Sequence, residues 1–384
     1  MTPPIHFVLV RSWRVLVAVV LSGLVVSGTA VGIAGAAAAI GRPVHRVPAQ
    51  IPGDCSRDVT DDLNTWIAGK RKGSILSFPK QACFRLDGTL LIDHKRGLTI
   101  RGHGSTLRAF TEGNESRRHV KILDGGNVTI SNLTVIGANP NAGLGDSAWS
   151  RSHAAQHAFT LNGVQGALLD RVQAYDVYGD FVYIGMDSKL RPSRDITVLD
   201  STFDRNGRQG ITVTGGENVL IKRTTVANVR MSVIDLEPMS DDWYAKDVRV
   251  IGCRLGPRRI STLSAASQGA VDSVTFNDNT IIGPLRVIVQ AKDPNRRYSG
   301  FRFVGNTAED VPDTGDRLMW FTKVDDVYLS DNRFLFREGS GADLMALSNV
   351  RHALVEDNNL SGVDEIFVLR DDTNVDIQAR RNVT

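Results

Sequence analysis

The chain has 384 residues, of which 23% are charged and 42% hydrophobic, an ordinary composition for a folded, water-soluble domain. Its formal net charge is only +3. Residues 1–40 contribute +2 of this, because they hold two arginines and no acidic residue, so the remaining 43 basic and 42 acidic residues leave +1. This balance argues against a general nucleic-acid binder, so we expect no nucleic-acid partner.

The first forty residues have the composition of a targeting segment. Arg11 and Arg14 precede an uncharged stretch over residues 15–41, which becomes rich in Gly and Ala at 32–39, a pattern suited to signal peptidase. The stretch is also long enough to span a bilayer as an uncleaved anchor. We therefore expect residues 1–40 to be a signal peptide or membrane anchor. The remainder is then secreted or extracytoplasmic, and contacts a membrane only through this segment.

Residues 54–96 are predicted to cap a repeat domain, with residues 41–53 as a linker before them. Thr60 can cap a helix whose first turn carries Asp61 and Asp62, where carboxylates interact favourably with the helix dipole. The predicted apolar face of this helix consists of Leu63, Trp66 and Ile67, and its end lies at residues 70–73. Such a helix would close the open end of the first repeat.

From Gly97 to the end, the chain repeats a short alternating strand, a polar turn and a second apolar run. Ile130, Val198, Ile221 and Leu329 occupy the same place in successive copies, and intervals between copies cluster in the mid-twenties. This period is too short for a propeller blade, and the strand-rich content argues against helical repeats. Residues 97–384 are therefore predicted to be a parallel β-helix, an all-β solenoid with two or three short strands per coil.

The three cysteines suggest one disulfide and one core residue. Cys55 and Cys83 flank the predicted capping helix, and a disulfide between them would fit an exported protein. On the chain-entropy model, a loop of that length contributes about 3 kcal/mol of stability. The alternative is a pair of free buried thiols. Cys253, inside a repeat, is expected to point into the core.

Several segments carry a resemblance to a known superfamily over about residues 50–384. They include Asp-Cys-Ser-Arg-Asp-Val-Thr at 54–60, His-Ala-Phe-Thr-Leu at 157–161, Tyr-Asp-Val-Tyr-Gly-Asp-Phe at 175–181 and Ile-Asp-Leu-Glu-Pro at 234–238. These segments resemble the secreted bacterial right-handed parallel β-helix proteins of the pectate lyase-like superfamily. The resemblance implies a right-handed coil and extracellular carbohydrate chemistry. The superfamily includes lyases, hydrolases and epimerases, so the reaction class stays open.

Motifs of the better-known subfamilies do not fit this chain. Polygalacturonase-like hydrolases carry an Asp-Asp pair before Gly-His-Gly, whereas here Gly102-His103-Gly104 precedes the acidic pair Asp241-Asp242. We interpret Gly102-His103-Gly104 as a turn. The Asp-Pro-His motif of alginate epimerases is missing, and no calcium-lyase signature is recognisable.

The second apolar runs of successive coils should stack in one sheet. If Phe159 and Leu161 point inward, together with the corresponding residues of later coils, the alternation of strands sends the residues between them outward. The predicted outward column is Thr160, Tyr183, Thr212 and Asp235, with Glu237 in the next column, and with His157, Asp180, Arg208 and Gln209 at the corner where these strands begin.

These residues carry the chemistry of two possible reactions. We assign catalytic roles to Asp235, Glu237, Asp180, Arg208 and His157, and substrate binding to Tyr183, Gln209 and Thr212. A lyase would use Arg208 or His157 as base and charge stabiliser and Tyr183 as acid, with Ca²⁺ held by Asp180 and Asp235. A hydrolase would use Asp235 and Glu237, whose positions on one strand fit the lower end of the carboxylate spacing of inverting enzymes, about 6.5–9.5 Å.

Each assignment has a structural alternative. Asp235 could form a salt bridge with Arg208 or Arg230, Asp180 could bond its own turn, and His157 could be satisfied by a carbonyl. The loop over residues 137–156 is either a groove wall or an ordinary insertion. The function predicted is that of a polysaccharide lyase or glycoside hydrolase, monomeric and without a certain cofactor or metal. The alternative is a non-catalytic glycan-binding or adhesion protein.

Overall fold

The computed structural model describes residues 41–283, 285–311, 318–336, 339 and 341–384, without side chains at 309–311. The predicted signal peptide or anchor lies outside the described residues. Arg42–Thr384 form one compact unit, an all-β parallel solenoid of about 12 turns. Within the described part of the chain, no helix has the length and apolarity needed to cross a membrane.

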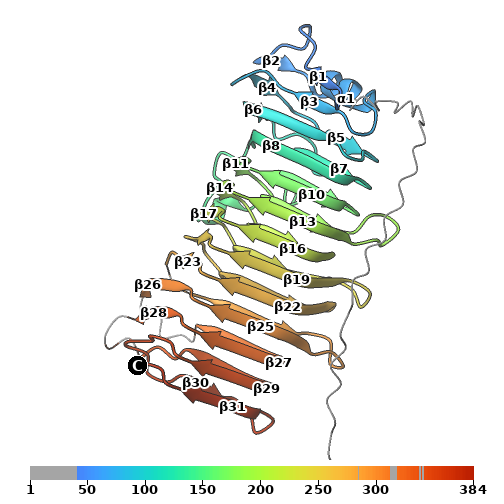
Figure 1. The fold of residues 1–384 in the computed structure, drawn as a ribbon. Coiled ribbons are helices and arrows are strands. Elements are labelled where there is room, and N and C mark those ends of the chain that lie inside the picture. Colours follow the sequence, from blue (N-terminus) through green and yellow to red (C-terminus); the bar gives the residue numbers. More distant parts are fainter. Residues whose placement is uncertain (1–40, 284, 312–317, 337–338, 340) are drawn as a thin grey trace, which may run out of the picture. The chain divides into compact units, whose positions relative to one another are not determined.

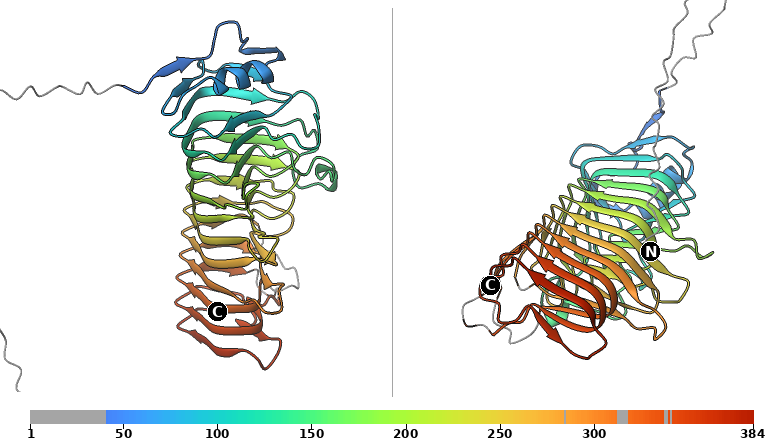
Figure 2. Two further views of the ribbon diagram at one scale, coloured as in Figure 1. Left: turned by 90° about the vertical axis from the view of Figure 1, so that its right-hand side faces the viewer. Right: turned by 60° about the horizontal axis from the view of Figure 1, so that its bottom comes forward.

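Each full coil contributes a strand to three parallel stacks that run the length of the molecule (Figures 1 and 2). We call these stacks sheets A, B and C, and the chain passes through them in the order C, A, B. Sheet A consists of β1 (Val44–Arg46), β3 (Ile75–Ser77), β6 (Thr99–Arg108), β8 (Gly126–Ile136), β10 (Gln165–Asp170), β13 (Ser193–Leu199), β16 (Gly216–Lys222), β19 (Tyr244–Ile251), β22 (Ala270–Asn277), β25 (Tyr298–Val304), β27 (Met319–Ser330), β29 (Met345–Glu356) and β31 (Val375–Arg380).

Sheets B and C are built from shorter strands, and the long strands of sheet A bend into them. Sheet B consists of β2 (Asp54–Asp58), β4 (Cys83–Arg85), the ends of β6 and β8, β11 (Gln173–Val177), β14 (Thr202–Asn206), β17 (Thr225–Ala227), β20 (Arg254–Leu255), β23 (Thr280–Ile281), β26 (Thr307–Val311) and β28 (Arg333–Phe336). Sheet C consists of β5 (Leu90–Asp93), β7 (Val120–Leu123), β9 (Phe159–Asn162), β12 (Val182–Gly185), β15 (Ile211–Val213), β18 (Ile234–Leu236), β21 (Leu263–Ser267), β24 (Val287–Ala291), the starts of β27 and β29, and β30 (Phe367–Leu369).

The alternation seen in the sequence explains the core. In β8 the buried side chains of Val128 and Ile130 point inward, and the chain turns from sheet A to sheet B at Asn132, whose φ is +51°. Leu133 and Val135 then continue the inward set on the second face. Every coil repeats this pattern, so the inward residues form one continuous apolar core. The predicted all-β parallel β-helix is confirmed.

A buried ladder of asparagines stacks beside the corner between sheets A and B in the later coils. Asn279, Asn306, Asn332 and Asn358 are each at most 2% exposed, and each donates its Nδ2 to the Oδ1 of the next, at 2.8–2.9 Å. Cys253 precedes the first rung, where its backbone N–H donates to Asn279 Oδ1 at 2.9 Å. Its side chain is buried, which confirms the predicted core position.

The capping helix α1 (Thr60–Ala68) lies at the N-terminal end of the coils (Figure 1) and buries Leu63, Trp66 and Ile67 as predicted. The predicted N-cap was wrong by one residue: Val59 holds that position without a side-chain bond, and Thr60 is the first helical residue. Asp58 takes over the capping role, because its Oδ1 accepts the Thr60 N–H at 3.0 Å and the Thr60 hydroxyl at 2.6 Å.

Two further contacts fix the start of the solenoid. Cys55 and Cys83 form a disulfide with Cα atoms 5.1 Å apart, which joins β2 to β4. Residues 41–53, predicted as a linker, contain β1, which pairs in parallel with β3 between Val44 and Ile75. The alternation of apolar and polar residues in this stretch is too short to predict a strand. The strand forms because β3 offers an edge to pair with.

Candidate functional site

The predicted outward column of sheet C exists. Thr160 pairs with Tyr183, Tyr183 with Thr212, and Thr212 with Asp235 in the parallel register. The flanking residues at each level are buried in the core, so the column faces away from it. The column extends one coil further toward the N-terminus, where Lys121 of β7 pairs with Thr160.

One arginine joins two carboxylates from different coils. Arg208 Nη1 donates to Asp180 Oδ2 at 2.8 Å, and its Nη2 donates to Glu237 Oε2 at 3.1 Å. The Asp180 side chain is fully buried, whereas that of Glu237 is 34% exposed. Asp180 also accepts the backbone N–H of Gln209 through Oδ1 at 3.0 Å. Both oxygens of Asp180 are therefore occupied by protein donors.

Asp235 is placed beside this cluster without an ion-pair partner. It is 4% exposed, and its Oδ2 is buried with no hydrogen-bond partner among the described residues. The alternative of a salt bridge is not observed, because Arg208 pairs with Asp180 and Glu237, and Arg230 pairs with Asp146 at 2.9 Å. A buried carboxyl group without an ion-pair partner is costly when ionised, which makes Asp235 a candidate functional acid.

The pKa values of the buried carboxyls follow from this arrangement. Burial raises the pKa of Asp235 to about 8, and the nearby charge of Glu237 adds to the shift. Burial also raises the pKa of Asp180, to about 6, against the opposing effect of the Arg208 guanidinium. The same carboxylates hold the pKa of Arg208 above its usual value, so it stays a cation. Asp235 is thus protonated at neutral pH.

His157 and Tyr183 form a stacked pair at the edge of the cluster. Their ring centroids are 4.7 Å apart and the ring planes differ by 12°. His157 Nδ1 accepts the backbone N–H of Asp180 at 2.9 Å, so the neutral ring carries its proton on Nε2. Burial and nearby cations hold the pKa of His157 well below its usual value. His157 is therefore a hydrogen-bond donor here, and its predicted role as a base does not fit this geometry.

Glycines make room for this pair. A Cβ at Gly179 would lie 2.7 Å from His157 Nδ1, and a Cβ at Gly185 would lie 2.7 Å from Tyr183 Cε1. Tyr183 also hydrogen-bonds to the Thr214 hydroxyl at 3.0 Å, which fixes the phenol. Burial raises the pKa of Tyr183, so it is protonated at neutral pH.

A cavity of about 530 Å³ opens beside these residues on the outer face of sheet C. His157, Tyr183 and Arg208 line it, together with Arg118 and Lys121 from the coil on the N-terminal side. Arg118 and Lys121 were not predicted from the sequence, because the outward column was expected to begin at Thr160. The apolar run at residues 120–123 was the available signal, since its alternation continues the same column.

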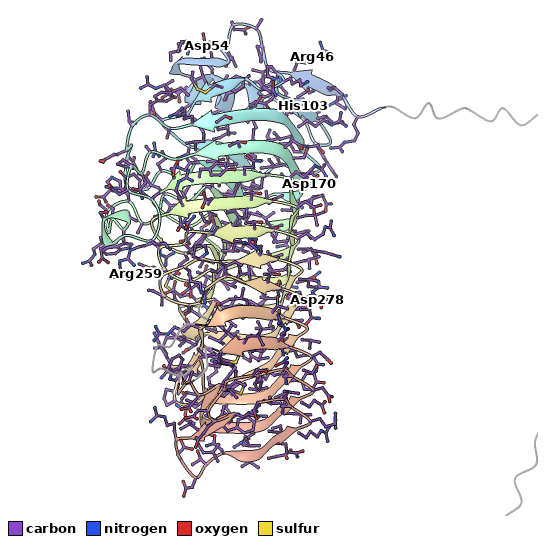
Figure 3. The ribbon with its side chains drawn as sticks, turned by 90° about the vertical axis from the view of Figure 1, so that its left-hand side faces the viewer. Arg46, Asp54, His103, Asp170, Arg259 and Asp278 are labelled. Carbon is purple, nitrogen blue, oxygen red and sulfur yellow. A yellow bond between two sulfur atoms is a disulfide. The ribbon has the colours of Figure 1, made fainter. Side chains whose placement is uncertain are left out.

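The loop over residues 137–156 forms part of the cavity wall. Ala154 and Ala155, near its end, line the cavity. Asp146, in the short helix η1 (Asp146–Ala148) of this loop, pairs with Arg230 and Arg259 from later coils. In Figure 3, Arg259 lies on the side of the ribbon opposite His103. These contacts fix the loop against the solenoid.

Five predicted residues do not line the cavity: Asp180, Gln209, Thr212, Asp235 and Glu237. Thr212 is fully buried, and Gln209 uses its Oε1 to accept the Ser232 N–H at 2.7 Å, so neither offers a free group to substrate. A Ca²⁺ site at Asp180 and Asp235 does not fit either, because protein donors occupy both Asp180 oxygens. The described residues contain no group of three or more His, Cys, Asp or Glu placed to hold a metal ion.

No family model matches the sequence, and no curated protein matches it. Solved structures do match the fold. The endo-xylogalacturonan hydrolase of Aspergillus tubingensis superimposes with a TM-score of 0.58 at 12% identity, over 89% of this chain and 100% of that one. This similarity shows the fold, a right-handed parallel β-helix.

Other β-helix proteins that match this one have different activities. The A-module of the mannuronan C-5 epimerase AlgE4 of Azotobacter vinelandii has a TM-score of 0.55 at 12% identity, over 84% of this chain and 96% of that chain. The surface adhesin PfbA of Streptococcus pneumoniae has a TM-score of 0.50 at 10% identity, over 86% and 91% of the two chains. The fold alone therefore does not select a function, and the side chains of the site must do so.

Proposed function

We propose that this protein is a glycoside hydrolase that acts outside the cell on a polysaccharide lying along the outer face of sheet C. The observation that carries the proposal is the contrast between two carboxyls two residues apart. Asp235 is buried without an ion-pair partner and is protonated at neutral pH, whereas Glu237 is partly exposed and paired with Arg208. A proton-bearing carboxyl beside one that is partly exposed and ion-paired can supply the acid and the base of a hydrolase.

In this reaction Glu237 removes a proton from a water molecule, whose oxygen attacks the anomeric carbon. The bond from that carbon to the glycosidic oxygen breaks, and Asp235 gives its proton to the departing oxygen. Arg208 orients Glu237 through the 3.1 Å contact. Asp180 acts through Arg208, so it is a positioning residue. The cavity beside them binds the neighbouring part of the sugar chain.

Arg118 and Lys121 make the cavity cationic, since Asp180 and Glu237 offset the charge of Arg208, and the lining acid Asp187 pairs with Arg191. This charge favours sugars that carry a carboxylate or another anionic group. The fold similarity to a hydrolase of xylogalacturonan is consistent with such a substrate. Acidic polysaccharides are therefore the first substrates to test.

A lyase is the second candidate, and the stacked pair of His157 and Tyr183 favours it. Both groups face the cavity with Arg118 and Lys121, which could stabilise the charge that develops when a proton is removed next to a uronate carboxylate. Arg118, whose pKa is lowered by burial, would accept that proton, and Tyr183 would give its own proton to the leaving oxygen.

Assays on a panel of acidic and neutral polysaccharides distinguish a hydrolase, a lyase and a non-catalytic binding protein. New reducing ends without ultraviolet absorbance of an unsaturated uronic product support the hydrolase. Reducing ends with that absorbance would replace it by the lyase. Tight binding without either product would contradict both and support a non-catalytic glycan-binding protein. Asp235→Asn should abolish hydrolysis, and Asp364→Asn, an exposed residue of a later coil, is the matched control.

A further inference from the structure

The Gly102-His103-Gly104 segment lies inside β6, where the strand bends from sheet A into sheet B. The pairing register with β8 shifts there, between Arg101 and Ser105. His103 and Gly104 have φ values of +51° and +79°. At Gly102 a Cβ would lie 2.2 Å from the carbonyl oxygen of Asn132, so only glycine permits this approach. The bend therefore leaves a hollow beside β6 that no side chain fills.

This hollow, which we call the corner site, has a volume of about 470 Å³, close to that of the cavity on sheet C. It is formed by the outer edge of several coils, and in Figure 3 His103 and Asp170 lie along the same edge of the ribbon. Its lining side chains all carry hydrogen-bonding groups, and none is an Asp or Glu: Lys80, His103, Asn132, Thr134, Arg171 and Gln173.

The polar groups of the corner site are ordered by contacts with one another. Arg171 Nε donates to Asn132 Oδ1 at 3.3 Å, and Thr134 Oγ1 donates to Gln173 Oε1 at 3.4 Å. Arg171 also pairs with Asp170, which offsets part of its charge. Lys80 has no ion-pair partner within the described part of the chain, so the site keeps a positive charge facing solvent.

A row of hydroxyl and amide side chains leads away from the corner site along sheet B. Thr106 pairs with Thr134, Thr134 with Gln173, Gln173 with Thr202 and Thr202 with Thr225. All five are at least partly exposed, one per coil. A row of donors and acceptors at the coil spacing of about 4.8 Å suits the repeated hydroxyls of an extended sugar chain.

We propose that the corner site is a second glycan-binding site, which takes an anionic sugar residue, carboxylated or sulfated, of a chain lying along this row of sheet B. Lys80 and Arg171 recognise the anionic group, while Asn132, Thr134 and Gln173 bond to the hydroxyls. The site lies on a different sheet from Asp235, and its lining residues lack the acid and base that the proposed hydrolysis uses. This inference does not rest on the proposed hydrolase activity.

The test compares Lys80→Ala/Arg171→Ala with the control Lys292→Ala/Arg351→Ala, both in the full chain carrying Asp235→Asn so that no probe is cleaved. The control pair removes the same charge from exposed positions outside both cavities. Each protein is titrated calorimetrically with a polygalacturonate decamer, with dextran sulfate and with neutral dextran, after thermal denaturation has shown equal stability.

We expect the control to bind at least one acidic probe at two sites per chain, and the corner variant to lose one site or weaken it at least tenfold. Comparison of the two acidic probes shows whether the carboxylated or the sulfated sugar is preferred. The corner site alone would be overturned if the corner variant bound the acidic probes as well as the control does. It would also be overturned if the variant lost binding of neutral dextran to the same extent as binding of the acidic probes. If the corner variant loses binding but the wild-type protein hydrolyses no polysaccharide, the corner site stands and only the proposed function is overturned.

Discussion

Two buried polar stacks run along this solenoid, and they differ in one respect. In the asparagine ladder each side-chain amide meets a partner on the next coil, at 2.8–2.9 Å. In the carboxyl cluster of sheet C, Asp180 and Glu237 share one arginine, and Asp235 has neither an ion pair nor a partner for Oδ2 among the described residues. The ladder stabilises the fold, whereas the cluster leaves a buried carboxyl oxygen of Asp235 without a hydrogen bond, at a cost that the fold must tolerate.

The largest expected effect is the loss of activity in Asp235→Asn. Asparagine keeps the shape but cannot donate the proton to the departing oxygen, so the hydrolysis rate should fall by about 10²–10⁴. Release of reducing ends from the polysaccharide identified in the panel measures this. Activity within twofold of wild type would show that the unpartnered carboxyl is not the acid.

The ladder should respond in stability instead. Asn306→Ala removes the acceptor of Asn279 Nδ2 and the donor to the Phe276 carbonyl, both buried, at a cost of about 2–3 kcal/mol in the free energy of unfolding. Denaturant unfolding measures the cost, with the exposed Asn295→Ala as control. We expect the folded Asn306→Ala protein to keep its activity. A selective loss of activity would contradict the separation of the two stacks.

The cluster should make stability depend on pH in an unusual direction. An Asp in the unfolded chain has a pKa of about 3.9, whereas that of Asp235 is raised to about 8 in the fold. The folded state therefore binds the proton more tightly, so stability declines as pH rises from about 4 toward 8. Asp235→Asn should flatten this decline and be more stable than wild type at pH 8, by about 1–2 kcal/mol. Parallel unfolding curves of both proteins from pH 5 to pH 9 would contradict the raised pKa.

The smallest effect is expected where the same column becomes apolar. Ser264 pairs with Ile288, and Ile288 with Trp320, so the column of Asp235 continues without titratable groups. Ile288→Thr should change the free energy of unfolding by less than about 0.5 kcal/mol and leave hydrolysis of short oligosaccharides unchanged. A rate reduced tenfold on such substrates would move the reacting centre toward the later coils.

The sequence predicted much of the fold and part of the site. Alternation within each repeat was sufficient to place Thr160, Tyr183, Thr212 and Asp235 in one column, which the register confirms. It did not predict that Val59 rather than Thr60 is the N-cap, because Asp58 supplies the capping bonds. It also missed Arg118 and Lys121, since a cavity depends on which side chains leave space between coils.

By itself, the sequence determined the parallel β-helix, its outward columns and the residues that stand in them, because strand alternation and repeat length are local properties of the chain. Only the tertiary structure decided that Arg208 pairs with Asp180 and Glu237 and leaves Asp235 without an ion pair. These groups lie 27 to 29 residues from Arg208. The stacking of whole coils determines which charged groups meet and how deeply each is buried. Charge pairing and burial together set the protonation states on which the proposed chemistry depends.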